Sequence, residues 1–364
     1  MGVGPVSLEG FASFVRDIGD RCTLIQLSGD RLIAGSHKGE VACWSISRGS
    51  EIWRVSVSGP CSDSDIDGNI MFFTESDKVH AINLENGDFV WSVSLEGSSD
   101  LIRYANGDVW ATSSVYELEI QDYTEASVWL IDRGGKLTKR WEIEGRAWTI
   151  SAVGEEVTLG LSRPRCGFVV VSKSSEPEYF SLENHAPITT GVLSDRDAIF
   201  LGHSDGGVSE LSGEARICRT AGSSSISSLD ASGEWIAGLE SGLIVSGEKL
   251  GSWIVETEGK VDFVKLGFAI DGRDCVWASS WSNQAVISII ELRNGVIELE
   301  ALHAERIGVA CSSGGVMALG DDIGNIFLFE QKVLERRLNQ AEEEFAGRKN
   351  RSLLRSRIRN LRSK

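Results

Sequence analysis

The segment Gly202–Gly206 (Gly-His-Ser-Asp-Gly) has the G-x-S-x-G spacing that positions a nucleophilic serine in many hydrolases. That chemistry needs the serine on a strained turn between a strand and a helix, with a histidine and an acidic side chain as partners. Here residues 208–211 (Val-Ser-Glu-Leu) alternate as a strand does, and three other segments share the two glycines without the serine. The motif is therefore predicted to be a tight β-hairpin. We assign no catalytic residue and expect no enzyme.

Alternating carboxylates occur at Asp63, Asp65 and Asp67, directly before Gly68. Oxygen ligands at alternate positions before a glycine are what the first half of a calcium-binding loop offers a hard cation. The twelfth position of such a loop should hold a bidentate glutamate, and here it holds Thr74. We therefore expect an ordinary polar turn and no bound metal, with Asp63, Asp65 and Asp67 as a weak calcium candidate.

The histidine and cysteine spacings point to neither a zinc site nor a redox centre. None of the five histidines forms a pair at metal-ligand spacing, and no C-x-x-C occurs. The seven cysteines are odd in number and none are adjacent, which favours free thiols in a reducing compartment over a disulfide framework. The first residues also lack a basic stretch followed by an apolar one. We expect no cofactor and a cytoplasmic protein.

Charge and hydropathy narrow the classes of partner. The net charge of −17 argues against nucleic acid or an anionic membrane as a partner for the bulk of the chain. The longest apolar run, Ala285 to Leu292, is far shorter than the roughly 20 residues that span a bilayer. No transmembrane segment is therefore expected.

A repeat organises the chain. Each copy has a polar turn, an apolar strand with a small residue near its end, a hairpin and another strand. We attribute the glycines of the hairpin to turns that need a positive φ. In four copies two glycines stand four positions apart, at Gly35/Gly39, Gly202/Gly206, Gly238/Gly242 and Gly320/Gly324. In weaker copies the first-glycine position is occupied by Thr74, Ala111, Gly160 and Ala278.

These eight positions are about 41 residues apart on average, within the ~40–45 residues of a β-propeller blade. Frequent glycine, rare proline and short clusters of Val, Ile, Trp and Phe agree with many short strands joined by tight turns. The prediction is an all-β fold, a β-propeller of eight four-stranded blades, with seven blades as the alternative. The widest step between copies holds an insertion at residues 115–126.

The last repeat lacks a fourth strand, because its strand sequence ends at Glu330. Residues 10–18 can supply that strand and close the ring, which leaves no sheet edge unpaired. The alternative is a helix, because the apolar residues of this segment also fit one helical face. We expect the strand, so that residues 1–330 form the propeller and ring closure needs nothing beyond Glu330.

Two segments, each after the third strand of a predicted blade, end in Gly-x-x-x-Trp, at Gly49–Trp53 and Gly87–Trp91. Looser copies of the pattern occur at Gly135…Trp141 and Gly247…Trp253. This pattern resembles the repeat of the PQQ-like (quinoprotein alcohol dehydrogenase-like) propellers. The resemblance implies eight blades with tryptophans that dock neighbouring blades. It does not imply the redox activity, because that chemistry in the family uses a pair of adjacent cysteines, absent here. WD40 propellers are the nearest alternative, although no Trp-Asp dipeptide occurs.

From Gln331 the pattern changes to helical spacing, with Leu334, Leu338, Ala341 and Phe345 at steps of 4, 3 and 4. Residues 331–364 carry 11 basic and 4 acidic groups, a net of +7, which leaves −24 on the first 330 residues. From residue 345 onward there are eight basic groups and no acidic one. We expect a basic helical tail that binds a partner, through Leu354, Arg355, Arg357, Ile358, Arg359 and Leu361. The alternative is a solvated tail, or a helix folded back on the acidic propeller of the same chain.

The favoured function is a non-catalytic scaffold for protein–protein interaction, with the propeller faces and the tail as separate binding elements. A nucleic-acid- or ribosome-associated accessory protein that acts through its basic tail is one alternative. An enzyme or ligand sensor that uses the central channel is another.

Overall fold

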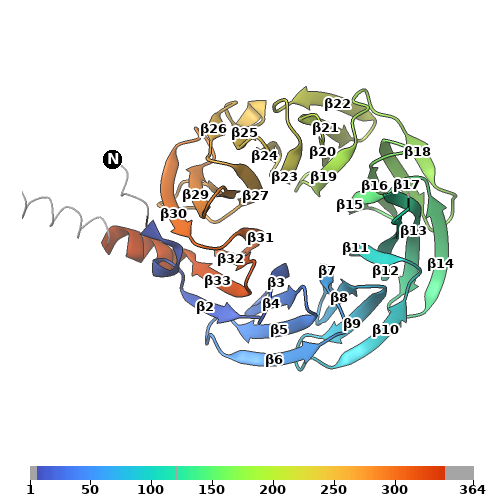
Figure 1. Cartoon of the computed structure of the whole chain (residues 1–364), viewed down its shortest axis with the longest axis horizontal. Coiled ribbons are helices and arrows are strands. Elements are labelled where there is room, and N and C mark those ends of the chain that lie inside the picture. Colours follow the sequence, from blue (N-terminus) through green and yellow to red (C-terminus); the bar gives the residue numbers. More distant parts are fainter. Residues whose placement is uncertain (1–5, 120, 341–364) are drawn as a thin grey trace, which may run out of the picture.

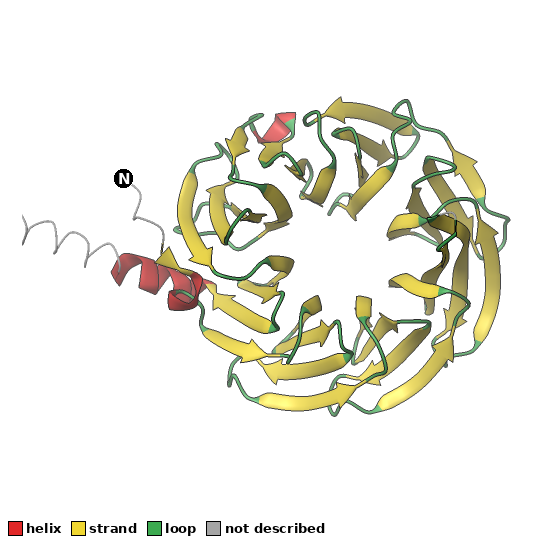
Figure 2. Cartoon of the chain, in the orientation of Figure 1, coloured by secondary structure: helices red, strands yellow, loops and turns green. Residues whose placement is uncertain are grey.

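The computed structural model describes residues 6–119 and 121–340, which form eight antiparallel blades arranged in a closed ring (Figure 1; Figure 2). The predicted all-β, eight-bladed propeller is confirmed. The four strands of a blade pair in chain order, with the first strand at the central channel and the fourth at the outer surface (Figure 1).

The strands follow the repeat closely. Blades one to three contain β3 (Cys22–Ser28), β4 (Arg31–Ser36), β5 (Glu40–Ser45), β6 (Glu51–Ser56), β7 (Cys61–Asp67), β8 (Ile70–Glu75), β9 (Lys78–Asn83), β10 (Phe89–Ser94), β11 (Ser98–Ala105), β12 (Asp108–Glu117), β13 (Asp122–Asp132) and β14 (Leu137–Ile143). Blades four to six contain β15 (Ala147–Val153), β16 (Glu156–Leu161), β17 (Gly167–Ser172), β18 (Glu178–Phe180), β19 (Ile188–Leu193), β20 (Ile199–His203), β21 (Gly207–Ser212), β22 (Ala215–Thr220), β23 (Ile226–Ala231), β24 (Trp235–Leu239), β25 (Leu243–Ser246) and β26 (Ile254–Glu256). Blade seven contains β27 (Lys260–Leu266), β28 (Cys275–Trp281), β29 (Ala285–Glu291) and β30 (Ile297–His303), and blade eight begins with β31 (Ile307–Ser313), β32 (Val316–Asp321) and β33 (Asn325–Glu330).

The small residue near the end of each second strand lets the next blade approach closely. A Cβ at Gly238 would lie 2.4 Å from Val261, and one at Gly320 would lie 2.5 Å from the sulfur of Cys22. Both glycines have ordinary strand backbone, whereas the second glycine of each pair has a positive φ, as Gly242 does at 87°. The expectation that the turn requires both glycines was therefore wrong for the first glycine of each pair. A small residue is needed there because the next blade packs against it.

Four tryptophans of the outer strands join neighbouring blades, as the resemblance implied. The Trp53 indole N–H donates to the Leu84 carbonyl of the next blade at 2.9 Å. A Cβ at Gly87, whose φ is 78°, would lie 2.9 Å from that ring. The glycine of one Gly-x-x-x-Trp motif therefore receives the tryptophan of the preceding blade. Equivalent indole bonds run from Trp91 to Arg133, Trp141 to Ser175 and Trp253 to Leu292.

The N-terminal segment completes the last two blades. Strand β2 (Phe14–Asp17) pairs antiparallel with β33 and forms the outer strand of blade eight. Before it, β1 (Val6–Ser7) pairs parallel with β30 and adds a fifth strand to blade seven. A short 3₁₀ helix, η1 (Leu8–Gly10), connects them, and a second, η2 (Glu248–Leu250), lies in blade six.

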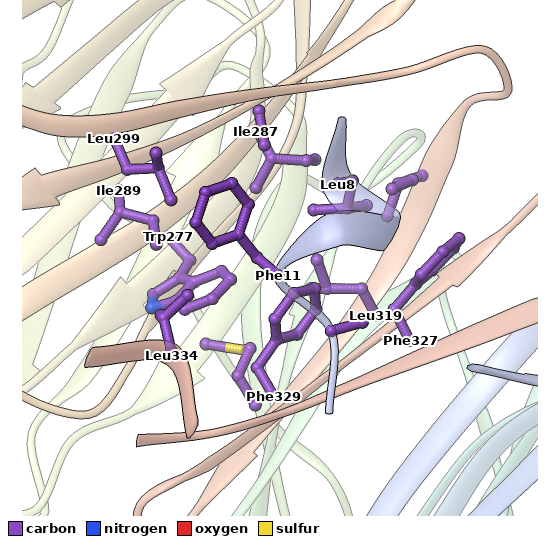
Figure 3. Packing of buried hydrophobic residues seen from close by; sticks show 14 of the residues in the cluster. Leu8, Phe11, Trp277, Ile287, Ile289, Leu299, Leu319, Phe327, Phe329 and Leu334 are labelled. Atoms are coloured by element: carbon purple, nitrogen blue, oxygen red, sulfur yellow. The ribbon is translucent and has the colours of Figure 1, made fainter. Parts of the chain in front are cut away.

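Residues 331–340 form a helix that packs where blades seven and eight meet (Figure 2). Leu334 is completely buried, and it shares a hydrophobic cluster with Leu8, Phe11 and Trp277 (Figure 3). We call Leu8, Phe11 and Leu334 together the clasp. Helix 331–340 thus adds apolar packing to a ring that β2 and β33 close, and the expectation that ring closure needs nothing beyond Glu330 stays a prediction.

Polar contacts fix the helix in the same place. The Gln331 side-chain amide donates to the Ala269 carbonyl at 2.8 Å, in the loop between β27 and β28. Arg337 donates to the carbonyls of Gly10 at 3.0 Å and of Ala12. The helix thus contacts both the ring and the segment that closes it.

Candidate functional site

The channel-lining strand has a β-bulge at the same point in all eight blades, opposite the small residue of the second strand. A bulge adds one or two unpaired residues and re-aims a side chain. We call the first unpaired residue of each bulge, taken over the eight blades, the mouth ring. Its members are Thr23, Ser62, Asp100, Trp148, Thr189, Ser227, Asp262 and Gly308.

Hydroxyl side chains of the mouth ring bind the backbone across the seams between blades. The Thr189 hydroxyl lies 3.2 Å from the Gly202 carbonyl of its own blade and 2.7 Å from the Ile226 carbonyl of the next. Ser227 makes the equivalent pair of contacts one blade further along, at 3.0 and 2.5 Å. These hydrogen bonds pair backbone carbonyls next to the β-bulge, where the bonding between strands is interrupted. The hydroxyls therefore stabilise the fold.

The two carboxylates of the mouth ring bind arginines that lead into the next blade. Arg306 holds both oxygens of Asp262, at 2.9 and 2.5 Å, and the Asp262 side chain is 1% exposed. Arg146 pairs with Asp100 at 2.8 Å. Burial raises the pKa of the Asp100 carboxyl, against the opposing hydrogen bonds and ion pair. Both carboxylates are thus held in ion pairs with arginine that stabilise the fold.

Three members of the mouth ring depart from this use. Ser62 in blade two is exposed, and Trp148 in blade four remains 43% exposed. Gly308 in blade eight, across the ring (Figure 1), has no heavy atom within 4 Å of a Cβ built on it. Trp148 and Gly308 line a cavity of about 370 Å³ at this mouth, together with Arg21, Lys260 and Asp322. An exposed indole therefore faces a cavity with open space on its far side.

Trp148 is held from behind by a stack of rings and a guanidinium. The Arg146 guanidinium carbon lies 4.4 Å from the Trp148 ring centroid and 4.2 Å from that of Tyr123. Such cation–π contacts contribute about 0.5–2 kcal/mol each. Tyr123 in turn meets Tyr116 edge to face, with ring centroids 5.1 Å apart. The stack orders the indole before any ligand arrives, which reduces the entropy lost on binding.

The insertion at residues 115–126 lengthens the hairpin of blade three. Strands β12 and β13 reach 10 and 11 residues. At the end of the hairpin Tyr116 is 47% exposed and Leu118 is 82% exposed. The insertion therefore adds apolar surface beside the mouth without adding a new domain.

Asp63, Asp65 and Asp67 do not form a calcium loop, because they lie on strand β7. Asp63 accepts from the backbone N–H of Ile102 at 3.0 Å, and Asp65 accepts from that of Tyr104 at 2.8 Å, both in the next blade. Asp67 pairs with Arg133 at 2.7 Å, and Asp63 also binds Arg103. In the described part of the chain, no group of three His, Cys, Asp or Glu side chains is placed to share a metal ion.

The Gly-His-Ser-Asp-Gly segment is a hairpin, as predicted. His203 ends β20, and its ring nitrogens meet the Ala186 carbonyl at 3.0 Å and the Ser209 hydroxyl at 2.8 Å. The turn serine, Ser204, is not among these partners. Burial lowers the pKa of His203, so the ring is neutral near pH 7 and serves as a core hydrogen-bond group.

His303 has the opposite electrostatic setting, and it joins the N-terminal segment to blade eight. Its Nδ1 lies 2.7 Å from Glu9 and its Nε2 lies 3.0 Å from Asp321. Burial alone would lower the pKa of His303, but hydrogen bonds to Asp321 and Glu9 outweigh it and raise the pKa. Against the effect of burial, hydrogen bonds from Ser7, the backbone and His303 lower the pKa of Glu9, and hydrogen bonds from His303 and Asn325 lower that of Asp321.

All seven cysteines are free thiols. Burial raises the pKa of Cys43 and of Cys61 to about 12 in each case, and that of Cys275 to about 11. Thiols with such pKa values are almost entirely protonated near pH 7 and are poor nucleophiles.

The comparison with protein families agrees with the seam tryptophans. Residues 16–152 match the family described as outer membrane protein assembly factor BamB. Over these residues the chain matches a PQQ-like propeller family. No curated protein matches its sequence.

Solved structures share the propeller fold of this chain at low identity. The computationally designed Ika8 protein matches with a TM-score of 0.70 and 14% identity, covering 86% of this chain and 98% of its own. BamB from Moraxella catarrhalis matches at 0.68 and 14%, with 88% and 99% covered. Sqt1 from Saccharomyces cerevisiae matches at 0.69 and 13%, with 88% and 98% covered. These likenesses establish the fold alone.

The residues predicted to bind a partner, Leu354, Arg355, Arg357, Ile358, Arg359 and Leu361, lie outside the described residues. Among the described residues, no helix has the length and apolarity needed to cross a bilayer. The mouth ring was missed from the sequence because its eight members share no residue type. One signal was present: an arginine two positions before Trp148 and two before Gly308, at Arg146 and Arg306.

Proposed function

We propose that this propeller is a non-catalytic scaffold that binds a protein partner at the channel mouth around Trp148. The observation that carries the proposal is the contrast within the mouth ring. The hydroxyls of Thr189 and Ser227 and the two carboxylates are bound to the fold, whereas Trp148 is exposed and pre-ordered beside a cavity. Tryptophan is enriched among the residues that dominate protein interfaces, and an arginine-backed indole fits that use.

The chemistry of the mouth supports a binding role over a catalytic one. Its charged groups form pairs: Arg306 with Asp262, Lys260 with Glu240, and Arg21 with Asp322 at 3.3 Å. General acid–base or nucleophilic chemistry needs a titratable group free to react and aimed at a common point. Paired charges around an exposed indole instead suit recognition of a peptide segment.

Affinity capture with matched variants tests this proposal. Tagged full-length wild type, Trp148→Ala and Phe89→Ala are compared, because Phe89 is also 43% exposed but lies on the outer strand of blade two. We expect a partner that is recovered with wild type and Phe89→Ala and is reduced about tenfold or more with Trp148→Ala. Equal recovery with Trp148→Ala would refute the mouth as the contact. Circular dichroism of each variant checks that the fold is retained.

The basic C-terminal segment is the second binding element of this proposal. The observation that favours it is the run of eight basic groups without an acidic one from residue 345 onward. Changing Leu354, Ile358 and Leu361 to Ser tests its apolar residues, and changing Arg355, Arg357 and Arg359 to Gln tests its charge. Loss through the arginines alone, with binding to a generic RNA that weakens in salt, would favour the nucleic-acid accessory role.

A cytoplasmic location completes the proposal. Its support is the set of seven free cysteines, four of them buried, since disulfides are rare in reducing compartments. Fractionation of cells that express the tagged chain tests it, and recovery with secreted or envelope proteins would refute it.

A further inference from the structure

The extended hairpin of blade three and the hollow at its base form an apolar surface that the repeat does not require. Tyr116 and Leu118 are exposed at the hairpin end. A groove of about 730 Å³ follows at the base, with apolar lining from Ala126, Ile143, Pro177 and Tyr179. We call these six residues the blade-three surface.

The charges around the blade-three surface favour a cationic ligand. Arg140 at the groove is bound to Glu96, and Glu144 pairs with Arg165 at 3.2 Å, so the excess negative charge comes from three further glutamates. Exposed Glu117 and Glu119 stand beside Leu118 on the hairpin. Apolar side chains surrounded by excess carboxylate attract a segment that is both apolar and basic. The glutamates of the groove are Glu96, Glu125, Glu142, Glu144 and Glu176.

We propose that the blade-three surface binds residues 345–364 of a second copy of this chain. That segment has eight basic groups and no acidic one, and its Leu354, Ile358 and Leu361 stand at spacings of 4 and 3. Its aliphatic residues match Tyr116, Leu118 and the groove floor, and its arginines match the glutamates. The inference rests on the proposed function only in taking the tail as a binding element; it does not involve Trp148.

The place and direction of helix 331–340 favour a second copy over the same one. Helix 331–340 packs at the seam between blades seven and eight and points away from the ring, whereas blade three lies on the other side (Figure 1). Each copy has one tail and one blade-three surface, so the contact joins different patches on the two partners. Such head-to-tail contacts add copies in an open series unless the geometry closes a ring.

Sedimentation velocity of the full-length chain over a concentration series tests the proposal. The variants are Glu125→Gln with Glu142→Gln, which removes charge from the surface, and Arg355→Gln with Arg357→Gln and Arg359→Gln, which removes charge from the tail. We expect the wild-type mean mass to rise with concentration and to fall in high salt. Each variant alone should self-associate roughly tenfold more weakly or worse. Phe89→Ala, the matched control on the outer strand of blade two, should associate like wild type.

Mixing the two variants separates this contact from any other. The surface variant keeps a native tail and the tail variant keeps a native surface, so the mixture can form one native contact and should stop at a 1:1 dimer. A wild type that is monomeric throughout, variants that associate like wild type, or a mixture that stays monomeric would each overturn the proposal. Loss of association by Phe89→Ala, which lies outside the blade-three surface, would also overturn it.

Discussion

The seam between blades one and two and the seam between blades seven and eight are closed by different means. The first is closed within the repeat, because Trp53 of one blade docks on Gly87 of the next. At the second, Leu299 stands in the tryptophan position after Gly295, and the space is filled by Leu8, Phe11 and Leu334. Side chains that lie more than 300 positions apart in the sequence thus take the place of one docking tryptophan.

This difference shows why the ends of the chain belong to the ring. A propeller can close with one strand from the N-terminus, as β2 does here against β33. A seam without its docking tryptophan still needs apolar side chains to exclude water. The clasp supplies them, and the C-terminal helix is therefore a structural element before it is the start of a tail.

The largest effect is expected at a tryptophan-docked seam. Trp53→Ala should lower the free energy of unfolding by about 3–5 kcal/mol, because it removes a buried ring and the hydrogen bond to Leu84. Thermal and urea unfolding measure the change. Trp148→Ala is the control, since the exposed indole of Trp148 should cost well under that amount. A small effect of Trp53→Ala would mean that the seams do not depend on their tryptophans.

A somewhat smaller effect is expected at the clasped seam. Leu334→Ala should lower the free energy of unfolding by about 2–4 kcal/mol, because Leu334 is completely buried against Trp277 and Phe11. Leu118→Ala, at an 82% exposed leucine, should change it by less than about 0.5 kcal/mol. If the two leucine variants unfolded alike, the helix would not be part of the fold.

The smallest effect is a pH dependence of the clasped seam. The pKa of His303 is raised above its ordinary 6.5, so its proton stabilises the folded state below that pH. This contribution is lost as the pH rises through the folded pKa. Wild-type stability should therefore fall between pH 6.5 and 8.5, and His303→Gln should remove that slope.

His203→Gln is the matched control for the pH experiment. Burial lowers the pKa of His203, so any contribution from its titration is lost as the pH falls, not as it rises. This variant should be less stable overall but keep the alkaline slope. A slope that survives in His303→Gln would contradict the assignment to the Glu9–His303–Asp321 contact.

The sequence allowed the repeat to be counted because every blade needs a small residue where the next blade packs. In two blades the predicted position of this small residue was one residue too early. The strand pairing places Thr112 and Ser279 at the sites that the sequence analysis assigned to Ala111 and Ala278. Small residues stand at both positions there, so spacing alone could not choose. The seam tryptophans came from the family resemblance, and their glycine partners explain why the motif repeats.

The clasp and the mouth ring could not be predicted for different reasons. The Leu334 and Leu338 spacing indicates a helix with an apolar side, but a local pattern does not reveal that the side faces Leu8 and Phe11 of the distant N-terminal segment. A bulge is a change of pairing register between two strands, and it needs no particular side chain. Trp148 therefore carried no sequence signal beyond its type and the arginine two positions before it.

Hydrogen exchange of Leu334→Ala, followed by mass spectrometry with Trp53→Ala alongside, tests the central claim most directly. If the clasp closes the seam between blades seven and eight, Leu334→Ala should speed exchange in β1, β2 and the strands β27 to β33, while blades two to four keep wild-type protection. Trp53→Ala should give the opposite map, with faster exchange in β3 to β10. A uniform rise around the ring in Leu334→Ala, or wild-type protection in blades seven and eight, would contradict the account.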